Sequence, residues 1–219
     1  MSDSNKIPSI VIVDYGVGNL HSLVKAFRQF GITPIISEDP TETENADGIV
    51  LPGVGSFEGG MQGLAMRNLG DAVKNFAVSG KPIIGICLGA QLLFEKGYEF
   101  GEHDGLGIIA GRVVEMPRQM PNVKLPHIGW NTIQQKEQSW NNTIFHDLGE
   151  KPHVYFVHSF ILEPTDQQVT LATTTYGGHE FVSAVQQNNI FGCQFHPEKS
   201  GEIGLSIIKN FIQIVSSEQ

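Results

Sequence analysis

The sequence predicts an α/β fold: a sandwich with a central, mainly parallel sheet, flanking helices and additional antiparallel strands. Short apolar runs in the first half lack the polar alternation of a half-exposed strand, so their strands are expected to be covered on both faces. Helical segments separate these runs, and strand–helix–strand order favours parallel pairing through right-handed crossovers. The second half is instead rich in strand-like segments separated by turn residues.

The first elements follow directly from this pattern. Residues 9–14, SIVIVD, are predicted to form a buried strand. Asn19 is predicted to cap a helix that runs to Phe30 and stops at Gly31. The apolar residues of that helix recur at helical spacing: Leu20, Leu23, Val24 and Phe27.

The later elements of the first half are two strands, a helical region and another strand, at residues 33–37, 48–52, 60–79 and 81–86. The second half carries the strand-like segments GRVVEMP, GWNTIQ, HVYFVHSF, VTLATTTY, FVSAVQ and IFGCQF, and a final helix at about 202–215. A length of 219 residues without a convincing linker is expected to form a single domain over residues 1–219.

Composition narrows the functional classes. The chain is 40% hydrophobic and 17% charged, as in an ordinary globular core. Its formal net charge of −9 argues against nucleic acid and anionic membranes as partners. No apolar run approaches the ~20 residues of a membrane span, and the opening residues lack a secretory signal. Two cysteines make no disulfide framework, so a reducing cytoplasm is expected.

The stretch GICLGAQLLF, residues 85–94, places a lone thiol between a predicted strand and a predicted helix at 88–95. Gly85 and Gly89 flank Cys87 in the pattern of a nucleophile elbow, where a sharp turn excludes bulky neighbours. The helix N-terminus would stabilise a thiolate, and the amide of Leu88 could stabilise an oxyanion. The alternative is a buried structural cysteine.

A base for this thiol is expected in FGCQFHPEKSG, residues 191–201. His196 is predicted to end a strand, and Glu198 lies two residues further on, on the same side of an extended chain. The carboxylate could then orient the imidazole. The alternative is a solvated turn. Cys193, three residues before His196, would face the opposite side and is predicted to be core packing.

A second oxyanion amide is expected from the turn LPGVGSFEGGM, residues 51–61, which follows a strand directly. Gly53 and Gly55 let the backbone approach a ligand and turn its peptides, so Val54 or Gly55 could supply the amide. The alternative is a simple surface turn. The loop DYGVGN, residues 14–19, resembles only part of a phosphate-binding glycine motif, because His21 occupies the third glycine position.

No metal site is expected. The remaining candidate histidines, His127, His153 and His158, show no metal-ligand spacing with other histidines or cysteines.

Two motifs in order, GICLGAQ at 85–91 and QFHPEKS at 194–200, resemble those of the class I glutamine amidotransferases over nearly the whole chain. The resemblance implies the fold of that family and hydrolysis of glutamine without a cofactor. It implies Cys87 as nucleophile, His196 as base and then acid, and Glu198 as the group that orients His196. It also implies substrate contacts from Gln91, Ser159 and Phe160.

Three further segments look like the glutaminase subunits of imidazole glycerol phosphate synthase: PGVG, DYGVGN and PHIGWN at 126–131. This resemblance implies a heterodimer with a (β/α)8 barrel cyclase in histidine biosynthesis, with ammonia passed directly into the barrel. It places Asn19, Trp130 and Lys199 at the interface. We further expect the turn at 52–55 to be misaligned until partner and nucleotide bind.

Other functions stay open at this point. A paralogous glutaminase could supply ammonia to another synthase, for example one that amidates a sugar or surface-polysaccharide precursor. A catalytically silent subunit is disfavoured by the intact Cys87, His196 and Glu198. A cysteine peptidase or chaperone of a related α/β sandwich is disfavoured by His-Pro-Glu at a late strand end.

Overall fold

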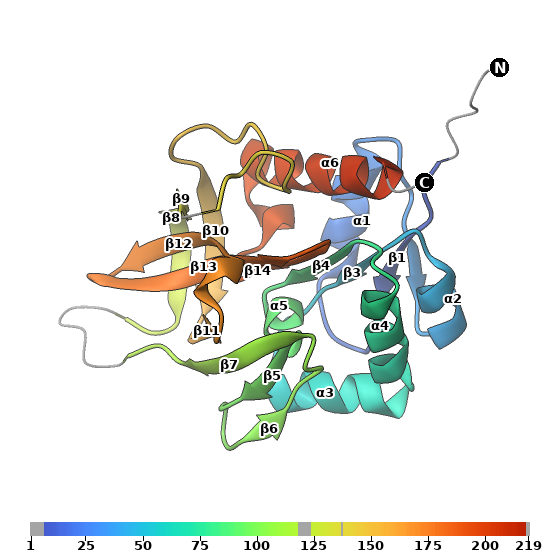
Figure 1. Cartoon of the computed structure of the whole chain (residues 1–219), viewed down its shortest axis with the longest axis horizontal. Helices are drawn as coiled ribbons and strands as arrows, with labels where there is room; N and C mark the ends of the chain where they lie inside the picture. The colour runs from blue at the N-terminus through green and yellow to red at the C-terminus, as the bar shows by residue number, and fades with distance from the viewer. Residues whose placement is uncertain (1–6, 118–123, 137, 218–219) are drawn as a thin grey trace.

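A computed structural model describes residues 7–117, 124–136 and 138–217 of the chain (Figure 1). A mixed sheet runs through the centre of the molecule. Its strand order is β2 (Ile35–Ser37), β1 (Ile10–Val13), β3 (Gly48–Leu51), β4 (Ile83–Ile86), β14 (Ile190–Cys193), β13 (His179–Gln187), β11 (Phe160–Pro164), β7 (Ile109–Glu115), β5 (Phe94–Gly97) and β6 (His103–Asp104).

The sheet is parallel from β2 through β14, which confirms the expected pairing of the first half. Four of these strands, β1, β3, β4 and β14, are buried along their whole length. Their apolar side chains alternate between two core clusters: Ile10 and Ile12 of β1 join one, Val11 and Val13 the other. This two-sided burial explains the continuous apolar runs in the sequence.

Beyond β14 the sheet becomes mostly antiparallel. The pairs β14–β13, β13–β11 and β11–β7 are antiparallel, whereas β5 and β7 run parallel. Two further strands, β12 (Thr170–Tyr176) and β9 (Gln134–Gln135), extend this half beside β13. A separate two-stranded antiparallel sheet pairs β8 (His127–Thr132) with β10 (His153–His158). The predicted antiparallel additions are therefore present.

Helices cover both faces of the parallel half (Figure 1). On one face, α1 (Leu20–Arg28) and α6 (Gly201–Ser217) contribute to the first core cluster; on the other, α3 (Phe57–Met66) and α4 (Leu69–Val78) contribute to the second. The predicted cap of α1 is confirmed, because the Asn19 Oδ1 accepts a hydrogen bond from the Ser22 amide at 3.4 Å. The final helix is two residues longer than predicted at its C-terminal end.

Two element predictions were wrong in detail, and one helix was not predicted. The helical region at 60–79 is two helices, because Asn68 takes a left-handed conformation with φ 55° between them. The elbow helix predicted for 88–95 is α5 (Leu88–Leu92), and Phe94 already begins β5. The helix α2 (Pro40–Asn45), capped by Asp39, was not predicted, because its sequence PTETEN has no apolar periodicity.

Candidate active site

The turn between β4 and α5 presents Cys87 in a strained backbone conformation, with φ 53° and ψ −108°. A Cβ at Gly89 would overlap the Leu51 carbonyl, and a Cβ at Gly85 would lie 2.8 Å from the Ala90 Cα. Both glycines are therefore required by close backbone approach, as the sequence predicted. Because α5 has five residues, its dipole contributes less at Cys87 than the predicted helix would.

His196 lies three residues beyond the end of β14 and directly before a short 3₁₀ helix, η2 (Pro197–Lys199). Its Nδ1 lies 2.8 Å from the Glu198 Oε1, and the two side chains are 2% and 3% exposed. Since a carboxylate only accepts, Nδ1 carries the proton and donates it. The prediction of an extended His-Pro-Glu segment was wrong, but the tight turn still brings the two side chains together.

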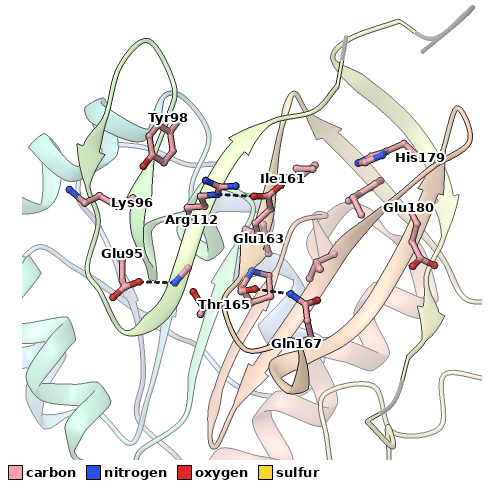
Figure 2. Close-up of a pocket in the computed structure, with 15 residues that line it drawn as sticks. Glu95, Lys96, Tyr98, Arg112, Ile161, Glu163, Thr165, Gln167, His179 and Glu180 are labelled. Carbon is pink, nitrogen blue, oxygen red and sulfur yellow. Dashed lines mark hydrogen bonds and ion pairs between the residues drawn. The ribbon is translucent and has the colours of Figure 1, made fainter. Parts of the chain in front are cut away.

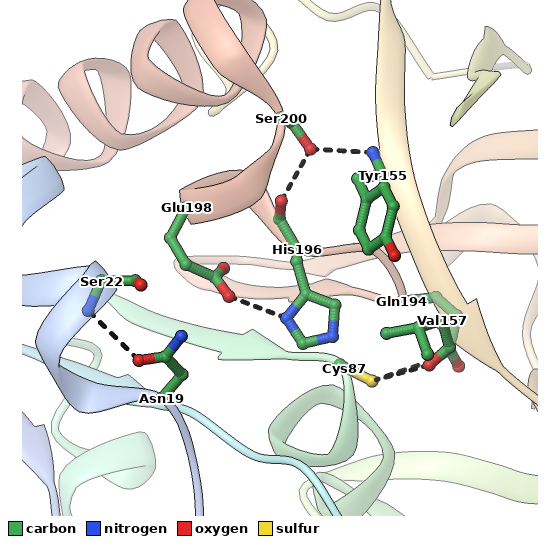
Figure 3. Close-up of polar contacts among 9 residues, drawn as sticks. All are labelled: Asn19, Ser22, Cys87, Tyr155, Val157, Gln194, His196, Glu198 and Ser200. Carbon is green, nitrogen blue, oxygen red and sulfur yellow. Dashed lines mark hydrogen bonds and ion pairs between the residues drawn. The ribbon is translucent and has the colours of Figure 1, made fainter. Parts of the chain in front are cut away.

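The imidazole ring of His196 lies between Glu198 and the sulfur of Cys87 (Figure 3). Burial disfavours the charged imidazole, but interactions with Cys87 and Glu198 outweigh burial and raise the pKa of His196 to about 9. The imidazole therefore stays protonated beside the sulfur at neutral pH. A protonated imidazole at this place can give its Nε2 proton to a leaving group.

The second cysteine lies in a different environment. Cys193 is fully buried in the core, as predicted, and burial raises the pKa of its thiol. Its backbone carbonyl accepts a hydrogen bond from the Cys87 amide at 2.7 Å, so it supports the elbow through its main chain.

The side-chain amides of Gln91 and Gln194 link the Phe160 carbonyl to the sulfur of Cys87. The Gln91 Nε2 lies 3.4 Å from the Phe160 carbonyl and 3.1 Å from the Gln194 Oε1. Because a carbonyl only accepts, Gln91 must donate to both, and Gln194 is left with its amide nitrogen toward Cys87 Sγ, at 3.8 Å. These linked amides thus end in an N–H donor at the nucleophile. Sequence reasoning gave no role to Gln194, although this polar residue opens the motif QFHPEKS two positions before His196.

A cavity of about 270 Å³ opens beside the sulfur. It brings together residues that the sequence places far apart: Val54, Gly55, Cys87, Leu88, Gln91, Glu99, Pro126, Val157, His158, Ser159 and Phe160. The predicted nucleophile, turn amides and substrate contacts therefore share one cavity. Gly53 is not among the residues that line the cavity. It packs against the elbow, where an added Cβ would lie 2.7 Å from the Leu88 Cβ.

Glu99 is a cavity residue that sequence reasoning missed. Its Oε2 accepts a hydrogen bond from the Phe57 amide at 2.7 Å, which fixes the carboxylate at the cavity. A carboxylate there can bind a cationic amine. No pattern in the sequence distinguishes Glu99 from a surface glutamate, because its neighbours at the cavity come from other elements.

A larger cavity, about 660 Å³, lies over β5, β7, β11 and β13 (Figure 2). Its charged side chains are paired within or beside it: Arg112 and Glu163 form an ion pair at 2.8 Å, and Lys96 pairs with Glu102 at 2.8 Å. Neither Cys87 nor His196 lines it. Cavity size therefore does not locate the reactive groups of this protein.

The predicted interface residues lie on neighbouring elements. Asn19 is exposed before α1, Lys199 is half-buried in η2, and Trp130 on β8 is 56% exposed. The indole of Trp130 lies against the ring of Tyr155, with centroids 6.1 Å apart. Lys199 is part of η2, and both α1 and β10 contact η2. Asn19 directly precedes α1, and Trp130 lies on β8, the strand that pairs with β10. Asn19, Trp130 and Lys199 therefore lie around one side of the site.

Across residues 7–117, 124–136 and 138–217, histidines, cysteines and carboxylates form no group of three or more that could hold a metal ion. Within the same residues, no helix has both the length and the apolar character needed to cross a membrane.

Fold and site together define an α/β protein with a cysteine nucleophile at a strained elbow and a buried histidine–carboxylate pair beside it. Residues 11–214 match the family described as glutamine amidotransferase class-I. Two solved structures share the fold: a putative GMP synthase protein from Thermoplasma acidophilum (TM-score 0.71, 24% identity, 97% of this chain and 96% of that one) and PurLQS from Thermotoga maritima (TM-score 0.71, 20% identity, 95% and 99%).

Two relatives are more similar in sequence. The imidazole glycerol phosphate synthase subunit HisH 1 of Legionella pneumophila (strain Lens) is 47% identical over 211 residues, covering 94% of this chain and 99% of the relative. Subunit HisH of Trichodesmium erythraeum (strain IMS101) is 44% identical over 207 residues, covering 94% and 95%. The chain belongs to the class-I glutamine amidotransferase family and, within it, to the HisH subunits of imidazole glycerol phosphate synthase.

Proposed function

We propose that this chain hydrolyses glutamine to glutamate and ammonia at Cys87, and passes the ammonia to a (β/α)8 barrel cyclase that makes imidazole glycerol phosphate and an aminoimidazole carboxamide ribotide. The observation that carries the proposal is the buried His196–Glu198 pair, at 2.8 Å, beside a cysteine that faces a substrate-sized cavity. The cytoplasm, where histidine biosynthesis would take place, is the proposed location, and residues 1–219 are proposed to act as one domain. The two core clusters support this, because alternate residues of β1 belong to each.

The first chemical step would be attack of the Cys87 thiolate on the carboxamide carbon of glutamine. His196, protonated because of its raised pKa, would then give its Nε2 proton to the departing ammonia. Glu198 would stabilise the imidazolium and hold its Nδ1 proton. Water would hydrolyse the γ-glutamyl thioester, with His196 now acting as the base, and return the free thiol.

The tetrahedral intermediate places negative charge on the former amide oxygen. We propose that the amide of Leu88, on the elbow side, and that of Val54 or Gly55, on the turn, donate to this oxygen. Val54 is 40% exposed and Gly55 has φ 119°, so the turn side is less constrained than the elbow. This contrast supports a turn that becomes fully aligned only in the assembled synthase.

The rest of the cavity would hold the amino-acid end of the substrate. Glu99 is proposed to pair with the α-ammonium group, and the backbone at Ser159 and Phe160 to bind the α-groups of the substrate. Gln91 uses its amide nitrogen on Phe160 and Gln194, so its Oε1 is the atom left to accept from the substrate carboxamide.

Docking of the cyclase is proposed to occur on the side formed by Asn19, Trp130 and Lys199. An exposed tryptophan is an unusual surface residue and a frequent interface anchor. Lys199 directly follows Glu198 in η2, so a partner that contacts this lysine would lie close to the catalytic histidine.

The experiment compares Cys87→Ser with Cys193→Ala in the chain assembled with its cyclase subunit. We expect Cys87→Ser to lower kcat for glutamine hydrolysis by at least about 10³-fold, because a hydroxyl at that position has no base strong enough to ionise it fully. The control Cys193→Ala should retain activity within a few-fold. A glutamine-analogue alkylator should label Cys87 alone in peptide mapping; labelling of Cys193, or full activity of Cys87→Ser, would contradict the proposal.

A further inference from the structure

Tyr15 is a buried polar side chain to which the proposed mechanism gives no role. It lies two residues beyond β1 in the loop DYGVGN, and its side chain is fully buried. Its backbone carbonyl accepts a hydrogen bond from Arg67 Nη1 at 3.3 Å. The same carbonyl packs so closely on α3 that a Cβ at Gly63 would overlap it. The main chain of Tyr15 is therefore firmly held.

The hydroxyl of Tyr15 donates a hydrogen bond to the carbonyl of Pro52, the first residue after β3. A proline has no amide proton, so this carbonyl is its one backbone hydrogen-bonding group. Gly53 follows, and a Cβ there would lie 2.5 Å from the Tyr15 hydroxyl oxygen. The hydroxyl thus contacts both residues that form the first peptide of the turn.

The same hydrogen bond divides the turn into two parts. The peptide between Pro52 and Gly53 cannot rotate without losing its buried donor, whereas Val54 is 40% exposed and Gly55 would accept a Cβ without contact to other atoms. A reorientation of the turn is therefore confined to the amides after Gly53. Those are the amides that line the cavity beside Cys87.

We propose that Tyr15 is a positioning residue for glutamine hydrolysis: its hydroxyl holds the first peptide of the turn, so that the amide of Val54 or Gly55 reaches the oxyanion. The inference deepens the proposed function and rests on the turn's role in it. Burial, reinforced by the charge of Cys87, keeps the pKa of the Tyr15 hydroxyl well above its usual range. The hydroxyl consequently stays protonated, and remains a hydrogen-bond donor, at every pH at which the enzyme is active.

The test is Tyr15→Phe in the chain assembled with its cyclase subunit. Loss of one buried neutral hydrogen bond should lower kcat for glutamine hydrolysis by about three- to ten-fold and leave KM within two-fold, because the bond acts on the oxyanion amide and not on the α-groups of the substrate. The rate of Cys87 alkylation by iodoacetamide should stay unchanged, since that displacement of iodide forms no oxyanion. The matched control is Tyr98→Phe, whose ring is 41% exposed.

The second variant, for the case that Tyr15→Phe does not fold, is Gly53→Ala, whose Cβ would lie 2.5 Å from the Tyr15 hydroxyl oxygen and 2.7 Å from the Leu88 Cβ. It displaces the turn and should lower kcat for glutamine hydrolysis, so unchanged hydrolysis in this variant would overturn the positioning role. In Tyr15→Phe, equal loss of hydrolysis and alkylation, or no loss of hydrolysis, would overturn it. Failure of the proposed function itself looks different, because the unmodified complex would then release no glutamate from glutamine.

Discussion

The two walls of the cavity are each stabilised by a different kind of interaction. The elbow wall, β4 with Cys87 and α5, is fixed by backbone packing that leaves no room for a Cβ at Gly85 or Gly89. The facing wall, residues 157–160, is fixed by polar side chains. The His127 Nδ1 lies 3.0 Å from the His158 Nε2, and the His158 Nδ1 lies 2.9 Å from the Phe160 carbonyl.

The direction of the hydrogen bonds on the facing wall follows from its last acceptor. The Phe160 carbonyl only accepts, so the His158 Nδ1 carries a proton and its Nε2 is left to accept from His127. His158 is therefore neutral in this arrangement, and His127 donates from its Nδ1. Burial lowers the pKa of His158 to about 3 and that of His127 to about 4, which agrees with two uncharged rings.

The difference between the walls teaches what each can tolerate. The elbow wall, which packs against backbone, is destabilised by added volume and not by a change of pH. The facing wall, which depends on two neutral histidines, tolerates small changes in volume and is destabilised by protonation. Substitutions that add volume should therefore act on the packed wall, and a change of pH on the polar wall.

The largest expected effect is Gly89→Ala. Its Cβ would overlap the Leu51 carbonyl, and backbone atoms cannot move aside as a flexible side chain can, so we expect a loss of about 3 kcal/mol or more in the free energy of unfolding. The matched control is Gly70→Ala in α4, where the nearest atom, Leu106 Cδ2, lies 4.0 Å away. Alanine should stabilise that helix by up to about 1 kcal/mol.

Chemical denaturation of both glycine variants measures the difference. If Gly89→Ala unfolds with the free energy of the unmodified chain, the elbow is not held by backbone packing. The sign of the two changes is the sharper criterion, because alanine is the better helix former at both positions and only contact with β3 makes position 89 unfavourable.

A smaller effect is expected from the polar wall at acidic pH. An unfolded histidine binds a proton below about pH 6.5, whereas folded His158 stays neutral until about pH 3. The unfolded state therefore gains a proton that the folded state does not, and stability falls as the pH falls below 6.5. At pH 5 this histidine alone accounts for a loss of about 2 kcal/mol, and His127 acts in the same direction.

His196 has the opposite dependence. With its pKa raised to about 9, its contribution to stability is complete below pH 6.5 and is lost as the pH rises through 9. Unfolding measured between pH 6.5 and 5 thus isolates the polar wall. The slope against pH should become shallower in His158→Gln and stay unchanged in His153→Gln, at the exposed start of the same strand; equal slopes in all three proteins would contradict the neutral pair.

The two kinds of wall also differ in how well the sequence predicts them. Gly85 and Gly89 bracket Cys87 within five residues, so the elbow could be inferred from local spacing. The short, continuously apolar strands of the parallel half were also predictable from local sequence. The segment LLF after the elbow fits helix and strand equally well, and the helix was accordingly predicted too long.

Hydrogen bonds between distant elements leave no comparable local pattern. Gln91 and Gln194 are 103 residues apart in the chain, and Tyr15 lies 37 residues before the carbonyl that it contacts. Glu99 lines the cavity two residues beyond β5, a strand that begins inside the predicted elbow helix. Gln194, Tyr15 and Glu99 could be found once the fold placed their partners beside them, and not before, whereas Gln91 was expected from the family resemblance.

The smallest effect is expected where the polar wall meets His196. The Ser200 Oγ donates to the His196 carbonyl at 2.6 Å and accepts from the Tyr155 amide at 2.9 Å, while the His196 amide donates to the Tyr155 carbonyl at 2.9 Å (Figure 3). Ser200 is buried. The hydroxyl therefore ties the backbone of the histidine to β10, the strand that leads into the facing wall.

Ser200→Ala removes both hydrogen bonds of this hydroxyl, and the resulting shift of the His196 backbone should lower kcat for glutamine hydrolysis by about three- to ten-fold. Because the imidazole itself is displaced, alkylation of Cys87 by iodoacetamide should slow in parallel, unlike in Tyr15→Phe. Ser216→Ala, which removes a hydroxyl that donates to the Ile212 carbonyl within α6, is the control and should change neither rate. If hydrolysis slows while alkylation does not, Ser200 acts on the oxyanion side, and the separation between the two walls does not extend to catalysis.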